Sequence, residues 1–525
     1  MKNNVPIWIL ILLIGAIVLY RAATFSMTWD EAYTVTVYAA HGENIFSPEH
    51  YLPNNHILHT ILVWLMFQLA PWQEWAMRLP ACAGAFGCLF ALGMIGAFLF
   101  QPPISRDGKI SAKSAWEPLA GTFFLMTLVS FHPIVFQFYT FARGYGLSLC
   151  FSLLGFYYLL KCSEQNLSGR SLAFSGAAFG LSVATNLSAA LMNTCLILAA
   201  MLQWVCNRRI DTVVVKAILL RFCLPGAAIV GVLYVPIFAF VSLDTANYAT
   251  DSFFEGLLDM SLWSFGHSNI VPEESLTRVF LGIPISDDLF WTLIVVMPLA
   301  VFLPILLAGI VLAFSTLRQK TITDRRPLDE ALGIVALSLL FYGILLCVLD
   351  GFGKAAFPKD RTGIFPIAYF LVFTVLLFYR LRFENVSQTS RRFGNVLLVG
   401  IGLCLWHFLS LFLYPYYHNI WYADAEMKQI MLAVKQSESD QQAFVCTKLN
   451  IASADYYARK FDMQKTEILC TQTMDDPVRW AGLQQRVFFY LPGESEEMLR
   501  ETGAEIKIRS KMLHLGLIFA EKPSH

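Results

Sequence analysis

Met27-Thr28-Trp29-Asp30-Glu31-Ala32-Tyr33 directly follows the first long apolar run of the chain, and the polar segment after it ends in Tyr51-Leu52-Pro53-Asn54-Asn55-His56. Two adjacent carboxylates therefore stand at the end of a predicted membrane span, in a chain with only 14% charged residues. A carboxylate costs free energy to keep dehydrated at a membrane face, so it usually has a function there. We therefore start from Asp30 and Glu31 in predicting both the fold and the site.

The composition indicates a polytopic α-helical membrane protein. Of the 525 residues, 56% are hydrophobic and 14% are charged, whereas soluble domains carry about 25% charged residues. The formal net charge is zero, so nothing in the overall charge suggests a nucleic-acid partner. The sequence contains no Cys-x-x-Cys pair, which is a spacing typical of metal sites.

A spanning helix needs about 20 mostly apolar residues. On this criterion the sequence predicts about eleven spans, with membrane lipids around them. The length of the segment 57–70 leaves open whether it crosses, and the distribution of basic residues leads us to predict that it is an interfacial helix. The predicted spans lie near residues 5–22, 79–100, 118–134, 141–160, 171–186, 188–206, 218–242, 289–315, 331–350, 363–380 and 395–414.

The basic residues predict the orientation. If 57–70 does not cross, the loops on one side hold 18 Lys and Arg residues against 7 on the other, before the C-terminal tail. The richer side is the cytoplasmic one by the positive-inside rule. The first loop, 23–78, and the C-terminal tail are then extracytoplasmic.

The composition changes near Tyr416 to that of a soluble domain. We therefore predict a transmembrane domain over 1–415 and a small extracytoplasmic α/β domain over 416–525. Cys446 and Cys470 fall on successive predicted strands, and the sequence leaves open whether they pair. Strands are predicted at 443–447, 466–470, 486–491 and 515–519, and helices at 427–434, 453–461 and 494–502.

The acidic pair Asp30 and Glu31 suits general base catalysis. Transfer of a sugar to a hydroxyl or amine needs a group that accepts the proton of the acceptor. A single displacement with one base inverts the anomeric centre. The alternative is structural, because acidic residues also stabilise the N-terminus of a helix through its dipole.

Three cations, Lys354, Lys359 and Arg361, come together in a short extracytoplasmic segment. They are candidates for binding a phosphate leaving group, although snorkelling to lipid headgroups is the alternative. Arg143, between aromatic residues and glycines, is a further candidate. It could pair with Asp30, bind a sugar or phosphate, or pair helices.

Other polar residues are candidates for substrate binding: Tyr33, Asn54, Asn55, His56, Tyr145 and His267. One of the two asparagines is expected to cap the helix that follows them. His267 belongs to an acidic, aromatic loop over 243–288 that could equally be a solvated surface. No second ligand at fixed spacing accompanies His56, so we predict no metal or other cofactor, with a divalent ion as the alternative.

Three short motifs together resemble a known family. Asp30-Glu31-Ala32-Tyr33, Arg78-Leu79-Pro80 and Ala142-Arg143-Gly144-Tyr145-Gly146-Leu147 occur in the order seen in GT-C glycosyltransferases. The pattern is similar to the protein O-mannosyltransferase and aminoarabinose transferase type (glycosyltransferase family 39-like), over about residues 5–380.

The resemblance implies an enzyme of the bacterial inner membrane. It would take a sugar from a polyprenyl-phosphate donor and pass it to a lipid, glycan or protein acceptor on the extracytoplasmic face. Asp30 matches the catalytic acidic residue of the family, Glu31 its neighbour, and Arg361 the basic residue that meets the carrier phosphate. Asn54-Asn55-His56 replaces a proline-rich stretch of many relatives, and the α/β tail is not a β-trefoil, so the sugar and the acceptor stay open.

Two other functions remain alternatives. A transporter or flippase would often show internal repeats, and none is evident here. A ligase of undecaprenyl-linked glycans would share the lipid carrier without the early acidic pair.

Overall fold

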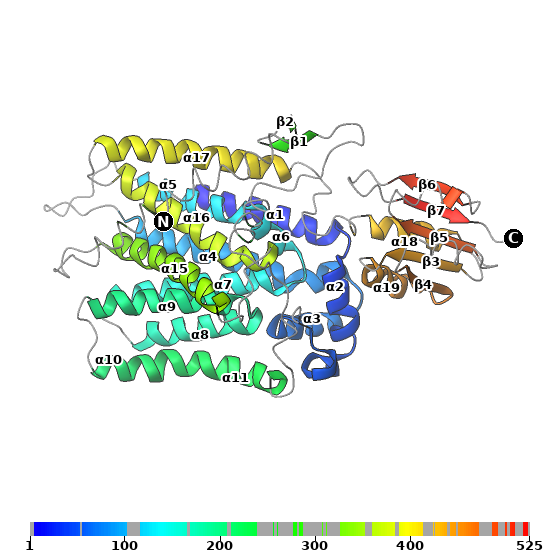
Figure 1. Ribbon diagram of the computed structural model, residues 1–525, viewed down its shortest axis with the longest axis horizontal. Helices are drawn as coiled ribbons and strands as arrows, with labels where there is room; N and C mark the ends of the chain where they lie inside the picture. Colours follow the sequence, from blue (N-terminus) through cyan, green and yellow to red (C-terminus); the bar gives the residue numbers. More distant parts are fainter. Residues whose placement is uncertain are drawn as a thin grey trace.

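The computed structural model describes most of the first 238 residues and separate later segments. The described residues are 5–52, 55–101, 116–164, 169–206, 212–238, 256, 260, 277–280, 283–286, 307, 311, 326–351, 360–383, 388–412, 424, 426–437, 442–447, 450–471, 486–491, 499–500, 504–509 and 518–522. Long helices lie side by side, and a small sheet lies beyond one end of them (Figure 1).

The bundle confirms the prediction of a polytopic helical membrane protein. Within the described residues, eight helices are long and apolar enough to cross a membrane, or nine if a bent pair counts as one span. Apart from residues 307 and 311, the predicted span 289–315 lies outside the described residues. The bundle helices are α1 (Val5–Thr24), α4 (Glu74–Leu99), α5 (Glu117–Ser130), α6 (Pro133–Thr140), α7 (Gly144–Glu164), α8 (Gly169–Thr185), α9 (Ala189–Cys206), α10 (Thr212–Ala217), the π-helix η5 (Ile218–Cys223), α11 (Leu224–Phe238), α15 (Pro327–Gly351), α16 (Ile364–Phe383) and α17 (Gln388–Phe412).

The outer surfaces of the bundle are apolar. Leu12 on α1, Val232 on α11 and Val396 on α17 are each more than half exposed. Large exposed apolar areas are unfavourable in water and mark surfaces that contact lipid or protein. The inner surfaces pack closely. A Cβ on Gly84 of α4 would come within 2.6 Å of the Leu147 backbone of α7, so only a residue without a side chain allows this approach.

The predicted span 118–134 is broken. α5 and α6 are bent by 73° at the break between them. His132 is extended there, with φ −59° and ψ 130°, and Pro133 is the first residue of α6. A proline disfavours helical geometry in the residue before it and lacks an N–H, which explains the bend. After α6, residues 141–143 are not helical, so α7 begins at Gly144 and not at 141 as predicted.

The first loop folds into short helices at one end of the bundle. α3 (Ile57–Leu69) has 13 residues and packs on α4, η1 and α8. It is too short to cross the bilayer, in agreement with the interfacial helix predicted for 57–70. The others are α2 (Trp29–Tyr33), the π-helix η1 (Thr34–Ala39) and the 3₁₀ helices η2 (Gly42–Phe46) and η3 (Pro48–His50).

The C-terminal part is an α/β sheet, as predicted. Its strands have the order β4-β3-β5-β7-β6, with β3 parallel to β4 and β5, and β7 antiparallel to β5 and β6. Cys446 and Cys470 are register partners. The elements are α18 (Met427–Gln436), β3 (Gln442–Thr447), α19 (Ile451–Lys460), β4 (Thr466–Thr471), β5 (Arg486–Leu491), β6 (Glu505–Arg509) and β7 (Ile518–Lys522).

Three details of the strands differ from the prediction. β6 lies where no strand was predicted, because its alternating Glu505, Ile506, Lys507 pattern was too short and charged to stand out. The last strand is β7, which begins at Ile518 and not at 515. Within the loop 243–288, β1 (Thr277–Phe280) and β2 (Ile283–Ser286) form an antiparallel pair.

Candidate functional site

Helix α2 carries both carboxylates and begins with a capping box. Thr28 has extended backbone geometry, and its Oγ1 accepts a hydrogen bond from the Glu31 N–H at 3.4 Å. The Thr28 N–H donates in return to Glu31 Oε2 at 3.0 Å. This reciprocal pattern satisfies amides that the first turn of a helix leaves without partners. Glu31 thus lies at a helix N-terminus, where the structural alternative for the acidic pair places it.

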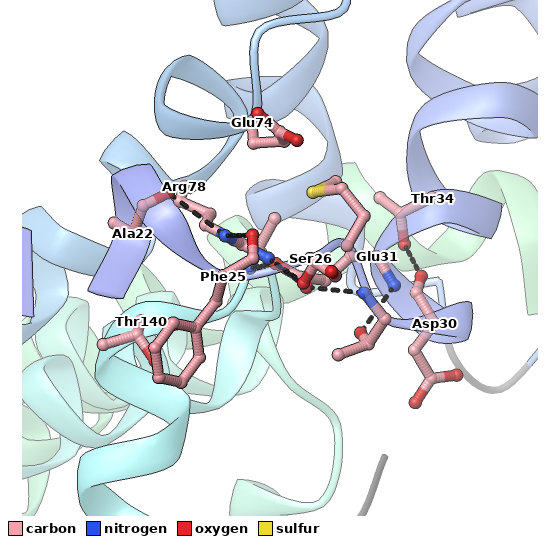
Figure 2. A network of polar contacts seen from close by, with 12 residues as sticks. Ala22, Phe25, Ser26, Asp30, Glu31, Thr34, Glu74, Arg78 and Thr140 are labelled. Atoms are coloured by element: carbon pink, nitrogen blue, oxygen red, sulfur yellow. Dashed lines mark hydrogen bonds and ion pairs between the residues drawn. The ribbon is translucent and has the colours of Figure 1, made fainter. Parts of the chain in front are cut away.

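Arg78 ties α2 to the end of α1. Its Nε and Nη2 donate to the two Glu31 oxygens, each at 2.8 Å. Figure 2 shows its other N–H groups directed at the backbone that joins the two helices, where they donate to the carbonyl oxygens of Ala22, Phe25 and Ser26. All five N–H donors of the guanidinium are used, and both side chains of the pair are fully buried.

Glu31 also fixes the segment before α7. The Ala142 N–H donates to Glu31 Oε1 at 2.6 Å. One carboxylate thus holds α2, α4 and residues 141–143 together, and both of its oxygens are engaged in hydrogen bonds. In this arrangement Glu31 positions its neighbours and does not have an oxygen open to a reactant.

Arg78→Ala is expected to destabilise the protein by about 3–5 kcal/mol, because it leaves Glu31 buried without its cation. The measurement is the free energy of unfolding of the full chain in detergent. Arg459→Ala is the control, since Arg459 pairs with Asp455 on a largely exposed surface and such pairs contribute about 0–1 kcal/mol. Equal stability of the two variants would contradict this role of Arg78.

The Asp30 side chain points away from this network (Figure 2). Its Oδ1 lies 3.5 Å from Arg143 Nη1, and its Oδ2 contacts the Arg361 guanidinium. Asp30 is 1% exposed. A buried carboxylate needs paired charge, and here two guanidinium groups supply it. Residues 30, 143 and 361, predicted from separate parts of the sequence, therefore meet at one point.

Each of the two arginines that contact Asp30 lies in a short segment that directly precedes a helix of the bundle. Arg143 belongs to the non-helical segment between α6 and α7, next to the Ala142 amide that Glu31 holds. Arg361 lies in the 3₁₀ helix η9 (Asp360–Gly363), directly before α16. Arg143 is buried, and none of its guanidinium nitrogens has a hydrogen-bond partner among the described residues. Its contact with Asp30 is an ion pair without hydrogen-bond geometry.

The start of α3 faces the same arginines. His56 is the residue before the helix, and its side chain makes no capping hydrogen bond. The Asn55 side chain does not cap either: its Oδ1, the atom that would accept from the helix amides, has no partner among the described residues, and its Nδ2 donates to the Ile45 carbonyl at 3.0 Å. The expected asparagine cap is therefore wrong for residue 55. Burial, with Arg143 nearby, lowers the pKa of His56 well below its ordinary value. The positive charge of Arg143 contributes to lowering the pKa of both His56 and His59.

The two tyrosines predicted for substrate binding are near this centre in the chain: Tyr33 is the last residue of α2, and Tyr145 is the second residue of α7. Tyr145 packs edge-on against His56, with ring centroids 4.9 Å apart. Tyr33 stacks on Trp29 at 5.3 Å. The remaining predicted site residues, Asn54, Lys354, Lys359 and His267, lie outside the described residues.

The C-terminal part reaches α2 through Asp424, a residue the sequence analysis did not single out. Asp424 Oδ2 accepts a hydrogen bond from the Trp29 N–H at 2.6 Å. Its Oδ1 accepts from Ser453 Oγ at 2.6 Å and from Asn450 Nδ2 at 3.3 Å. Asp424 therefore holds the first turn of the helix that carries Asp30. Burial raises the pKa of Asp424 to about 7, and the Asp30 charge adds to the increase.

A second set of contacts surrounds Glu74, the first residue of α4. Lys428 and Lys460 lie 3.2 and 2.5 Å from its carboxylate oxygens. The Tyr457 hydroxyl donates to Glu74 at 3.1 Å and accepts from the Met27 N–H at 2.8 Å. The C-terminal part is thus packed on the first loop by charged and polar contacts at the start of α2 and at the start of α4.

No sequence signal points to these contacts. Asp424 follows a segment without periodicity, and Tyr457 and Lys460 read as parts of an ordinary amphipathic helix. Their partners lie more than 380 residues away along the chain. Arg78 was noted only as part of a family motif, although the structure gives it the larger share of the contacts around α2.

Asp424→Asn is expected to reduce the pH dependence of stability between about pH 4 and pH 7. The carboxyl has an ordinary pKa of 3.8 and a pKa of about 7 in the folded protein. Over this interval the folded state holds a proton that the unfolded state has lost, so the free energy of unfolding decreases as the pH rises. The asparagine variant lacks this decrease, which amounts to at most about 4 kcal/mol.

The measurement is the unfolding midpoint of the full chain across this pH range. Asp455→Asn, a substitution of a more exposed aspartate on α19, is the control and should follow the wild-type curve. If Asp424→Asn also follows that curve, Asp424 does not titrate as described.

No group of three or more His, Cys, Asp or Glu side chains that could hold a metal ion occurs within the described ranges. The residues of the site that the structure places together are one carboxylate, two guanidinium groups and two uncharged imidazoles. Such a set can bind an anion and accept a proton.

Comparison with known proteins gives structural similarity only. No protein-family model and no curated protein matches the chain. The chain is similar to crystal structures of ArnT from Cupriavidus metallidurans, in the apo state with TM-score 0.48 and bound to undecaprenyl phosphate with TM-score 0.47. In both cases the identity is 11%, and the alignment covers 98% of this chain and 97% of the other. Because both scores lie below 0.5, we infer neither family nor activity from this similarity.

Proposed function

We propose that the protein is a GT-C type glycosyltransferase that moves a sugar from a polyprenyl-phosphate donor to an acceptor hydroxyl or amine. The observation that carries this proposal is the buried contact of the Asp30 carboxylate with Arg143 and Arg361. It joins a group that can accept a proton to two groups that can hold a phosphate, at the end of an apolar helical bundle.

The charges of this centre favour an anionic ligand. Among the described residues, the one negative charge of Asp30 lies against the positive charges of Arg143 and Arg361, and the nearby His56 is uncharged because its pKa is lowered. Arginine forms paired hydrogen bonds with phosphate oxygens, and the guanidinium of Arg143 has N–H groups without hydrogen-bond partners among the described residues. In this proposal a phosphate of the donor takes the position between the two arginines that the Asp30 carboxylate holds in this structure.

Release of Asp30 from the arginines then leaves its carboxylate to act as base. Asp30 accepts the proton of the acceptor O–H or N–H, and the acceptor atom forms a bond to the anomeric carbon. The bond from that carbon to the phosphate oxygen breaks, and its electron pair leaves with the polyprenyl phosphate. Arg143 and Arg361 compensate the charge of the leaving phosphate. A single displacement of this kind inverts the anomeric configuration.

The basic residues support an extracytoplasmic site in the bacterial inner membrane. Arg361 precedes α16, whose other end carries Arg380 and Arg382. Lys161 likewise lies at the end of α7 that is distant from Arg143. Basic residues concentrate on the cytoplasmic side of membrane proteins, so the end with Asp30 faces outward in this proposal. Glu31 acts as a positioning residue.

A lipid flippase or transporter is the second candidate, because α5 and α6 form a broken span and broken helices are frequent in transporters. Substitution of Asp30 distinguishes the two functions. Mass spectrometry of the lipids that copurify with the protein identifies the lipid-linked sugar, and that compound is the donor in the assay.

Asp30→Asn is expected to lower sugar transfer by at least about 100-fold, since general base catalysis contributes about 10²–10⁴ in rate. Binding of undecaprenyl phosphate should persist or become tighter, because the variant removes the carboxylate that competes for the arginines. Glu43→Gln, an exposed change in the first loop, is the control. Full transfer activity of Asp30→Asn would falsify the assignment of the base.

Arg361→Ala is expected to raise the Kd of the donor lipid by about tenfold or more, with a smaller effect on the KM of the acceptor, because a charge-assisted contact to phosphate is lost. Arg382→Ala, at the other end of α16, is the control. Equal weakening of donor and acceptor would count against a phosphate role for Arg361.

A further inference from the structure

Helix α3 presents a row of polar atoms to the interior that have no hydrogen-bond partner among the described residues. These atoms are His56 Nε2, His59 Nε2 and Thr60 Oγ1. The three residues are each at most 5% exposed. Their spacing of three and four residues places them on one side of the helix. This side differs from the lipid-exposed one, where Leu65 and Leu69 are exposed.

The ends of two other helices meet this side of α3. A Cβ on Gly144, the first residue of α7, would lie 2.9 Å from His56 Cβ and 2.5 Å from the Thr185 carbonyl oxygen of α8. Only glycine permits this approach without a shift of the neighbours. Asn186 follows directly, and its Nδ2 also has no hydrogen-bond partner in the described part of the chain. Arg143, adjacent to Gly144, acts electrostatically on both histidines.

Buried polar atoms are nearly always satisfied by protein, water or ligand. Four such atoms from α3 and the end of α8, beside a guanidinium that makes no hydrogen bond, therefore indicate a place for a polar ligand. Ser148 and Ser182, which lie on α7 and α8 further inside the bundle, bond to each other instead. The partnerless atoms thus gather at the end where Asp30 lies.

The chemistry of these groups selects the ligand. Burial and the nearby Arg143 lower the pKa of His59 to about 3, so its imidazole is uncharged. A neutral imidazole, a hydroxyl and an amide can each donate or accept a hydrogen bond, as sugar hydroxyl groups do. Two guanidinium groups close by disfavour a cationic amino sugar.

We propose that His59, Thr60 and Asn186, with His56, bind the hydroxyl groups of an uncharged saccharide on the donor lipid. The inference rests on the proposed function and adds to it the chemical class of the donor sugar. Arg143 and Arg361 hold the phosphate, and the polar side of α3 holds the sugar attached to it. These residues then determine which donor is accepted, separately from the binding of the carrier.

The test compares the binding of lipid probes to the full chain in nanodiscs. The probes are undecaprenyl phosphate, undecaprenyl phosphate linked to glucose, mannose or galactose, and undecaprenyl phosphate linked to 4-amino-4-deoxyarabinose. The variants are Thr60→Val and His59→Phe, and the matched control is Gln68→Leu, an exposed position on the same helix. Native mass spectrometry gives the Kd of each probe.

The wild type should bind at least one neutral glycosylated probe more tightly than undecaprenyl phosphate. Thr60→Val and His59→Phe should each reduce this preference by about five- to tenfold, the effect of one lost hydrogen bond, and change the Kd of undecaprenyl phosphate by less than about twofold. Because Thr60 Oγ1 has no hydrogen-bond partner within the described ranges, Thr60→Val should keep the wild-type unfolding midpoint. A lower midpoint would indicate a structural role.

Three outcomes would overturn the inference: no neutral sugar is preferred, the amino sugar is preferred, or both variants weaken all probes equally. If undecaprenyl phosphate itself does not bind the wild type, the proposed function fails, and the inference fails with it.

Discussion

The buried pair of Glu31 and Arg78 is the interaction on which the arrangement of the site depends. Arg78 uses every N–H donor of its guanidinium, and Glu31 accepts from α4, from the Thr28 amide and from the Ala142 amide. Asp30 directly precedes Glu31 in the chain, and Arg143 directly follows Ala142. Their side chains meet because the backbone beside each of them is held by the same carboxylate. The two neighbouring acids therefore have different surroundings: Glu31 contacts Arg78 and two backbone amides, and Asp30 contacts Arg143 and Arg361.

Charge balance explains why Asp30 can be buried at all. An isolated carboxylate at the edge of an apolar bundle is unfavourable, and a second cation makes the centre positive overall. A protein that needed only to bury Asp30 would require one arginine. Within the described part of the chain, Arg143 and Arg361 together carry one more charge than Asp30 does, and the proposed phosphate of the donor would compensate it. The ion pairs of Asp30 and the phosphate contacts of the proposed donor complex use the same guanidinium groups.

The sequence predicts the parts of this structure that depend on local pattern. The apolar helices, the short α3 and the alternating strands of the C-terminal sheet follow from hydrophobic periodicity, and scarcity of charge singles out residues 30, 143 and 361. The break before Pro133 was missed because the apolar pattern continues through it. Asp424, Tyr457 and Glu74 were missed for a different reason: their contacts join segments far apart in the chain, and only the folded structure brings them together. His59 and Thr60 read as members of an apolar helix until the burial of their polar atoms is seen.

The position of a bound phosphate tests the central claim most directly. A cryo-electron microscopy structure of the full chain with undecaprenyl phosphate should show the phosphate in hydrogen-bond contact with both Arg143 and Arg361, and the Asp30 carboxylate released from at least one of them. A phosphate bound elsewhere, with the contacts of Asp30 to both arginines intact, would contradict the account.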